Sequence, residues 1–321
     1  MNRDFSYYLS KYLKDYLIIE RNLSSNTIRS YKNTFQLLID YLVNIKNLKL
    51  SEITFSNITR EIIIDFLNYL EETKRNTTRT RNQRLAAIKA FYQYCAIDEV
   101  ENIDNINKIL SIKSKKYTKK VINYLTESEL KQIFDSIDTT TRIGRRDLTL
   151  LSLLYDTAAR ASEIINLKFD DIHLEDKYVI LTGKGNKQRV VPIMNKTCEL
   201  LKIYFRENYF NNGYLISNNE IKCNKNILAD ILSKYAGNIK KKISPHVFRH
   251  TRAVHLLDNG IQLIYIKELL GHSSITTTEE YAKVIEKRKI EALEKTSFSI
   301  IDNDLKDWNN DKDLLNQLLN M

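Results

Sequence analysis

The chain has 321 residues, 43% of them hydrophobic, which is enough for two domains that each bury a core. Its 50 lysines and arginines outnumber 40 acidic residues and leave a formal net charge of +10, which favours a polyanionic partner, DNA before an anionic membrane surface. No segment approaches about 18 uninterrupted apolar residues, and charges interrupt the N-terminus, so we expect no membrane span and no signal peptide.

The first 110 residues predict a helical domain, because glycine and proline are scarce and apolar residues recur at helical spacing. Ser24–Asn26 supply capping groups for a helix whose apolar stripe includes Phe35 and Leu42. A second helix is expected from Thr59 to Glu72 and a third from near Thr77 to near Tyr94. We read residues 1–110 as one helical DNA-binding domain.

A basic run, KRNTTRTRNQR at 74–84, forms the entrance to the third helix. It has five cations and no acid, whereas a solvated helix face usually mixes both signs, so phosphate contact is favoured over a merely solvated surface. The candidate DNA-binding residues are the five cations of this run, Lys74, Arg75, Arg79, Arg81 and Arg84, together with Lys89 farther along the helix.

Residues 111–123, SIKSKKYTKKVIN, have five lysines and no helical apolar period. They predict an interdomain linker, and a basic linker can also follow a DNA backbone. Lys115 and Lys116 are the candidate DNA contacts in it.

Residues 124–300 predict a second, mostly helical domain with a small β-hairpin. Thr126 and Glu129 form a capping box ahead of its first helix. Two β-type runs, KYVIL at 177–181 and RVVPI at 189–193, flank the glycine-containing turn TGKGNKQ. The fold class is therefore mainly α, with two domains, the second of them mixed.

The last helices of this domain carry clear end signals. Ser244 caps a helix that starts at Pro245 and ends by Gly260, and the next helix, from about Gln262, stops at Gly271. A final helix is expected near Thr276, with Thr276 and Glu279 as a second capping box.

Six polar residues of this domain could act together on a phosphodiester, although each by itself is common on a protein surface. Arginine and histidine donors suit the non-bridging oxygens of a phosphate, a lysine on a turn can protonate a leaving oxygen, and a tyrosine can attack as a nucleophile. They are Arg160, Lys184, His246, Arg249, His272 and Tyr281.

Metal ligands are not suggested by the sequence. It has no carboxylate cluster, and Cys95, Cys198 and Cys223 are too far apart for a metal site or a disulfide framework, which fits a reducing cytosol. The expected site therefore uses no metal and no cofactor, with fixed cations stabilising the transition state. We expect the protein in the cytoplasm, associated with the nucleoid.

The order and spacing of these features resemble the tyrosine recombinases, most closely the short Xer-type recombinases and related integrases. The matching stretches cover most of residues 20–285 and are LSSNTIRSY, RLAAIKAFYQY, LTESEL, RRDLTLLSLLYDTAARASEIINLKFDDI, GKGNKQRVVPI, SPHVFRHTRAVHLLDNG and ELLGHSSITTTEEYAK. The resemblance implies a SAM-like, helical core-binding domain at 1–110 and a catalytic domain at 124–300.

The resemblance also implies a role for each matching residue. Arg160 and Arg249 would clamp the scissile phosphate and His272 would bind it. Tyr281 would attack to form a 3′-phosphotyrosyl bond.

The remaining matching residues would act on protons or support the site. Lys184 would protonate the leaving 5′ oxygen and His246 would assist proton transfer. Glu163 would orient catalytic groups, whereas Lys187 and Arg189 would contact the DNA backbone.

The implied substrate is double-stranded DNA with a short inverted-repeat core site. The implied assembly is a homotetramer on DNA or a hetero-tetramer with a sister recombinase, with a directionality factor or a DNA translocase as a further partner and no membrane. Integration and excision of a mobile element and chromosome dimer resolution both fit. A type IB topoisomerase-like enzyme and a catalytically inactive DNA-binding relative are the alternatives.

Two features depart from the family pattern. Ala158 stands where the family usually has glycine, which costs about 1 kcal/mol if the backbone there has positive φ. Residues 301–321 form an acidic tail with five aspartates and an amphipathic leucine and tryptophan set, which would pack on its own domain or on a neighbouring protomer.

Overall fold

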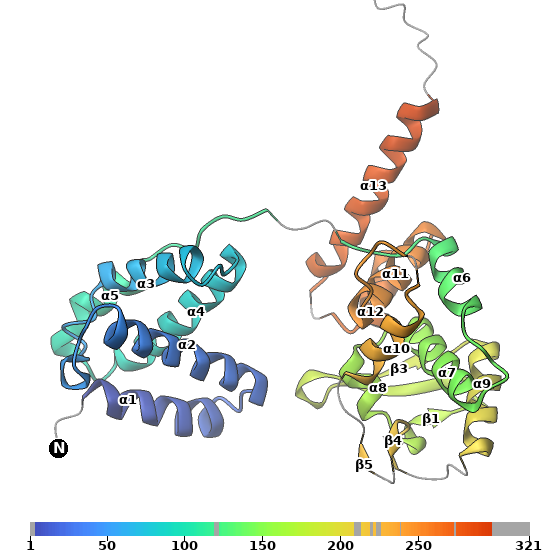
Figure 1. Cartoon of the computed structure of the whole chain (residues 1–321), viewed down its shortest axis with the longest axis horizontal. Helices are drawn as coiled ribbons and strands as arrows, with labels where there is room; N and C mark the ends of the chain where they lie inside the picture. The colour runs from blue at the N-terminus through green and yellow to red at the C-terminus, as the bar shows by residue number, and fades with distance from the viewer. Residues whose placement is uncertain are drawn as a thin grey trace, which may run out of the picture. The chain divides into compact units, whose positions relative to one another are not determined.

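The computed structural model describes residues 4–118, 122–208, 213–218, 221–222, 226–237, 239–272 and 274–296 (Figure 1). The chain divides into two compact units, Met1–Lys119 and Lys120–Met321, which are described separately below. The acidic tail at 301–321 lies outside the described residues. Within the described part, no helix is long and apolar enough to cross a membrane.

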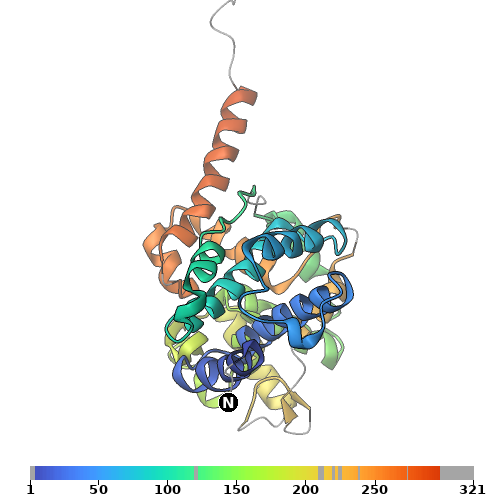
Figure 2. The same cartoon turned by 90° about the vertical axis from the view of Figure 1, so that its left-hand side faces the viewer.

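The described part of the N-terminal unit contains helices and connecting turns and no strand (Figures 1 and 2). Its α-helices are α1 (Phe5–Lys11), α2 (Ser25–Asn44), α3 (Arg60–Glu72), α4 (Thr78–Cys95) and α5 (Ile103–Leu110). A π-helical segment, η1 (Tyr12–Glu20), continues α1, and short 3-10 turns occur at η2 (Leu50–Glu52) and η3 (Val100–Asn102).

The helix starts in this unit follow from local capping. The hydroxyls of Ser24, Thr59 and Thr77 each accept a hydrogen bond from the backbone N–H three residues on, which satisfies an otherwise unpaired donor. The two helices expected from Thr59 and Thr77 are confirmed. An aromatic core holds them together, in which Phe91 of α4 packs edge-on against Phe5 and Phe35.

The C-terminal unit is mostly helical around a small antiparallel sheet. Its α-helices are α6 (Glu127–Asp135), α7 (Arg142–Thr157), α8 (Ala161–Asn166), α9 (Asn195–Glu207), α10 (Ile227–Tyr235), α11 (Pro245–Asp258), α12 (Leu263–Leu270) and α13 (Thr276–Thr296). The strands are β1 (Ile172–His173), β2 (Tyr178–Thr182), β3 (Gln188–Pro192), β4 (Ser217–Asn218) and β5 (Ile221–Lys222), with 3-10 turns η4 (Phe169–Asp171) and η5 (Lys184–Asn186).

The predicted hairpin is confirmed as β2 paired with β3, with Val179 opposite Val191 and Leu181 opposite Arg189. Val179, Leu181 and Val191 are buried, as period-two alternation in a half-buried strand requires. The two-residue strand β1 extends the hairpin to a three-stranded sheet, and β4 pairs with β5 in a separate ribbon. Neither feature can be predicted from the sequence, because a strand of two residues shows no alternation of apolar and polar residues.

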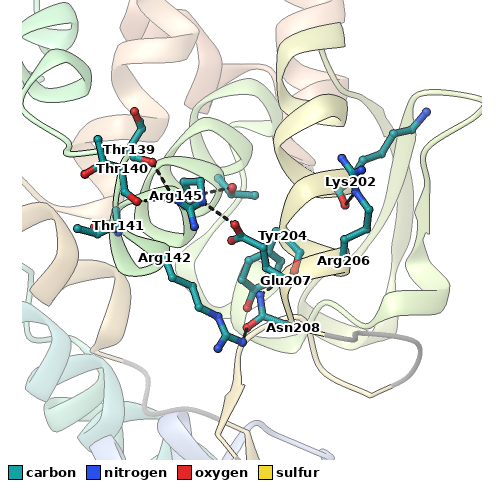
Figure 3. A network of polar contacts seen from close by, with 12 residues as sticks. Thr139, Thr140, Thr141, Arg142, Arg145, Lys202, Tyr204, Arg206, Glu207 and Asn208 are labelled. Carbon is teal, nitrogen blue, oxygen red and sulfur yellow. Dashed lines mark hydrogen bonds and ion pairs between the residues drawn. The ribbon is translucent and has the colours of Figure 1, made fainter.

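A polar network fixes the first turn of α7 (Figure 3). Arg145 donates to the carbonyls of Thr139 at 2.9 Å and Thr140 at 2.7 Å, and its Nε pairs with Glu207 of α9 at 2.6 Å. Arg142 donates to the side-chain oxygen of Asn208 at 2.8 Å. The start of α7 is thereby tied to the end of α9, and the opposite end of α7 leads into the candidate site.

The end signals of the last helices are confirmed with one exception. Ser244 caps α11, and Gly271 ends α12 in the left-handed conformation, with φ 61°. The capping box expected at Thr276 is wrong, because Thr276 is itself the first helical residue of α13. The Thr276 N–H instead meets the Ser274 hydroxyl at 3.3 Å, and the Glu279 N–H meets the carbonyl of Ile275 at 3.0 Å.

Candidate active site

A left-handed turn at the end of α7 places Arg160. Ala158 closes the helix with φ 47° and ψ 31° and is fully buried. Arg160 follows as the N-cap residue of α8, with its side chain about one-third exposed. An alanine in this conformation costs about 1 kcal/mol relative to glycine. Of the two possibilities for Ala158, an ordinary helical position or a positive φ, the structure has the positive φ.

Glu163 lies buried beneath Arg160 and joins it to Arg189. Its carboxylate accepts the Arg160 backbone N–H at 2.8 Å and Arg160 Nη1 at 2.9 Å. Arg189 of β3 donates to both carboxylate oxygens, at 2.9 and 2.8 Å, in a two-pronged ion pair. Burial by itself raises the pKa of Glu163, but the hydrogen bonds from Arg189 and Arg160 lower it to about 2. Glu163 is therefore ionised at neutral pH.

The contacts of Arg189 in this structure are to protein groups. We expected a DNA backbone contact, but its guanidinium is bound to Glu163, and its Nε donates to the carbonyl of Leu269 at 2.9 Å. The side chain is only 14% exposed. Glu163, which neutralises Arg189, lies 26 residues away in the chain, so the local charge pattern cannot predict this ion pair.

Arg249 is carried by α11 and is buried. Its two terminal nitrogens donate to the carbonyl of Ala158 at 2.8 Å and to that of Leu270 at 2.6 Å. Burial and then the nearby Arg160 charge lower its pKa to about 10, which still leaves it charged at neutral pH. His246, one turn earlier on α11, is exposed, and desolvation together with Arg249 and Arg160 lowers its pKa.

His272 follows the glycine that ends α12. Its Nδ1 lies 3.0 Å from the hydroxyl of Thr278 on α13. Burial, followed by the charges of Arg249 and Arg160, lowers its pKa to about 4, so the ring is neutral at pH 7. A neutral ring can donate one hydrogen bond to a phosphate without needing to be protonated first.

An open groove of about 770 Å³ brings part of the predicted set together. The lining residues are Arg160, Gly183, Gly185, Lys187, Gln188, Arg189, Gly271, His272 and Thr277. Lys184 lies in the turn η5 between β2 and β3 at the same groove by its backbone, and its side chain is outside the described part. The groove is cationic and supplies hydrogen-bond donors, which suits a phosphate.

Tyr281 is buried, with 2% of its surface exposed, and packs with Ala158, Val254 and Leu270. Its hydroxyl lies 2.8 Å from Nδ1 of His250, and its pKa is raised by burial. A buried phenol O–H needs a hydrogen-bond acceptor, and among the described residues the acceptor found for Tyr281 is His250. We therefore assign the hydrogen bond as Tyr281 donating to a neutral His250.

His250 is the residue that the sequence reasoning missed. Burial, then His246 and Arg249, lowers its pKa to about 4, so its ring stays neutral and able to accept. A signal was present in HVFRH, where His246 and His250 are four residues apart and share a helix face. Their rings lie 6.4 Å apart.

The basic run of the N-terminal unit divides into two kinds of residue. Lys74, Arg75 and Arg79 are exposed, as a DNA contact requires, and so are Lys115 and Lys116 of the predicted linker. Lys89 is partly buried, and desolvation lowers its pKa.

Arg81 and Arg84 do not fit the expected surface role. Arg81 is 3% exposed, with its Nε 3.5 Å from Glu71, so its guanidinium is enclosed between α4 and α3. Arg84 donates to the carbonyl of Ser30 and to the hydroxyl of Thr34, both at 3.0 Å, which joins α4 to α2. The contacts of these two side chains in the structure are therefore between helices.

Comparison with known proteins places this architecture. Residues 123–288 match the phage integrase family, and residues 10–99 match the N-terminal SAM-like domain of phage integrases. The chain belongs to the phage integrase family.

Individual relatives agree. This phage integrase family member is 30% identical to the tyrosine recombinase XerD of Listeria monocytogenes over 283 residues, which are 85% of this chain and 93% of the relative. It is also 30% identical to the tyrosine recombinase XerC of Bacillus pumilus over 286 residues, 84% and 90% of the two chains. The fold is shared with a solved XerH site-specific recombinase bound to palindromic difH substrate, at a TM-score of 0.68, 23% identity and coverage of 87% and 81%.

Proposed function

We propose that this chain is a site-specific DNA recombinase that cuts and rejoins DNA through a 3′-phosphotyrosyl intermediate. The observation that carries the proposal is the convergence of five segments. Arg160, His272 and the turn that holds Lys184 lie at the groove. Arg249 donates to the carbonyls of Ala158 and Leu270, and Tyr281 packs with the same two residues. These segments are far apart in sequence, and donors for an anion surround a groove beside a tyrosine.

The chemistry follows from the residue types. Arg160 and the neutral ring of His272 bind the non-bridging oxygens of the scissile phosphate in the groove, and Arg249 adds a second positive charge to that of Arg160. Tyr281 gives up its phenolic proton, with His246 assisting the transfer, and attacks phosphorus. The P–O5′ bond breaks, and Lys184 protonates the leaving oxygen. The new ester keeps the energy of the broken bond, so resealing by an incoming 5′-hydroxyl needs neither a metal nor ATP.

Cleavage on this scheme requires a rearrangement at Tyr281. The hydroxyl is buried and bonded to His250, so it must leave that position to reach a phosphate in the groove. The structure thus corresponds to a resting arrangement, and we propose that DNA binding supplies the free energy that moves Tyr281.

The substrate of the proposed reaction is double-stranded DNA with an inverted-repeat core site. Exposed cations on the first unit, such as Lys74 and Arg79, suit phosphate contacts. We propose that a tetramer assembles on DNA, from copies of this chain or with a sister recombinase. Integration and excision of a mobile element and chromosome dimer resolution are the two roles that fit this chemistry.

The test is covalent trapping on nicked duplexes taken from both flanks of the gene and from the chromosomal terminus. Wild type should form a denaturant-resistant adduct with DNA in EDTA, and Tyr281→Phe should form none. Tyr265→Phe is a matched control, because Tyr265 is an exposed tyrosine on α12. Tight binding without any adduct would support the inactive relative, whereas adducts that relax supercoils without joining two sites would support the topoisomerase-like alternative.

A further inference from the structure

Arg189 connects three segments that carry proposed catalytic residues. It binds Glu163, which in turn holds the backbone and side chain of Arg160. It also donates from Nε to the carbonyl of Leu269, two residues before Gly271 and three before His272. One guanidinium therefore contacts α8 and the end of α12 from its position on β3.

Two glycines leave room for this ion pair. A Cβ on Gly183 would lie 3.2 Å from Oε1 of Glu163, and a Cβ on Gly271 would lie 3.2 Å from Nη1 of Arg189. Both approaches are tighter than ordinary van der Waals contact. Gly183 directly precedes Lys184, and Gly271 directly precedes His272, so the backbones that present these two residues lie directly on the pair.

A phosphate contact would use Arg189 differently. A side chain that binds DNA keeps its charge and its donors available to the backbone, as exposed Lys187 does on the same turn. Arg189 has its charge opposed by a buried carboxylate, and three of its N–H groups are bonded to protein oxygens. Its fork matches the carboxylate geometry, which a lysine cannot reproduce.

We propose that Arg189 is a positioning residue for strand cleavage: it orients Arg160 through Glu163 and the His272 segment through Leu269, and does not serve as a DNA contact. The inference rests on the proposed function. Its physical basis is that a catalytic group displaced by about 1 Å can lose about a hundredfold in rate.

The proposal also predicts a pH dependence, through the pKa of Glu163, that a general loss of folding would not produce. Glu163 faces Arg160 on its own helix, Arg189 from β3 and Arg249 from α11. Burial raises its pKa, and the hydrogen bonds from Arg189 are the largest influence that lowers it. Without Arg189, Glu163 should take up a proton at a higher pH, and a protonated Glu163 would hold Arg160 less firmly.

The experiment compares wild type, Arg189→Met and Arg189→Lys in single-turnover adduct formation at saturating nicked duplex, with circular dichroism to check folding. Arg189→Met should be slower by about tenfold or more. Arg189→Lys keeps the charge but loses the fork, so its rate should lie between the two. The dependence of log Kd on log salt should be unchanged in both variants, whereas Lys187→Met, the reference for a lost phosphate contact, should lower that slope by about 0.9.

The pH profile completes the test. The ratio of the Arg189→Met rate to the wild-type rate should fall as pH is lowered from about 8 to about 5.5, as Glu163 becomes protonated. Arg189→Met combined with Glu163→Gln should give a ratio that does not change with pH. A wild-type rate with a reduced salt slope would identify Arg189 as a DNA contact and overturn the inference, and so would a rate loss independent of pH. Failure of wild type to form any adduct would instead refute the proposed function.

Discussion

The two units use partly or fully buried arginines in different ways. In α4, Arg81 lies against Glu71 and Arg84 reaches across to α2, so these cations hold helices together. In the C-terminal unit, Arg189 is likewise paired with a buried carboxylate, that of Glu163, yet this pair lies beside a groove and Glu163 also holds Arg160. A buried arginine thus joins two helices in one unit and, in the other, bonds to a carboxylate beside the groove that we propose binds phosphate, so its neighbours decide its role.

The largest expected effect is at the site. Arg249→Gln should slow adduct formation at saturating DNA by about a hundredfold or more, because it removes a fixed charge near the scissile phosphate. Single-turnover trapping measures it, and Arg81→Met in the other unit is the matched variant. Equal rate losses in Arg249→Gln and Arg81→Met would contradict the view that arginines of the first unit serve packing and those of the second serve the reaction.

Arg81→Met should instead act on stability. Removing a buried cation leaves Glu71 with Lys115 as its remaining ion-pair partner among the described residues, so we expect a loss of about 1–3 kcal/mol in unfolding free energy. Urea denaturation measures the loss. A normal unfolding midpoint together with a weaker salt dependence of DNA binding would show that Arg81 contacts phosphate after all.

Acid should destabilise the C-terminal unit through its histidines. His250 and His272 have folded pKa values of about 4, below the ordinary value near 6.5, so the unfolded chain binds more protons between these limits. Stability should therefore fall as pH drops from about 6.5 to about 4. His250→Asn keeps an acceptor for Tyr281 without titrating, so melting temperatures across this range should fall less steeply than in wild type. An unchanged slope would contradict the buried, neutral state of His250.

Exposed cations should affect binding alone. Arg79→Ala should reduce the slope of log Kd against log salt by about 0.9 and leave the unfolding free energy within about 0.5 kcal/mol of wild type. Filter binding at several salt concentrations measures the slope. A large loss of stability would show that Arg79, like Arg81, contributes to helix packing.

The smallest effect concerns the turn before Arg160. Ala158→Gly should raise stability by up to about 1 kcal/mol, because φ is 47° there. Ala159→Gly, at a buried neighbour that lacks a positive φ, should be destabilising. Thermal melting compares the two, and the same sign for both would show that backbone conformation does not govern this turn.

Local signals in the sequence were sufficient for most of the secondary structure. Hydroxyl caps at Ser24, Thr59 and Ser244 satisfy backbone donors within three residues, so no distant contact is needed to start those helices. The β2–β3 hairpin likewise follows from alternation around a glycine turn. The capping box predicted at Thr276 failed because the helix already begins at Thr276, whose N–H donates to the Ser274 hydroxyl two residues earlier.

The sequence by itself also determined the family, through the order and spacing of its motifs, and with it the candidate residues. Only the tertiary structure decided what each charged group does. Arg189 and Glu163 are 26 residues apart, and His250 and Tyr281 are 31 residues apart, so composition and periodicity cannot reveal their contacts. The physical reason is that burial removes water from a charged or polar group, which must then bond to whichever partner the packing of distant helices and strands brings within reach.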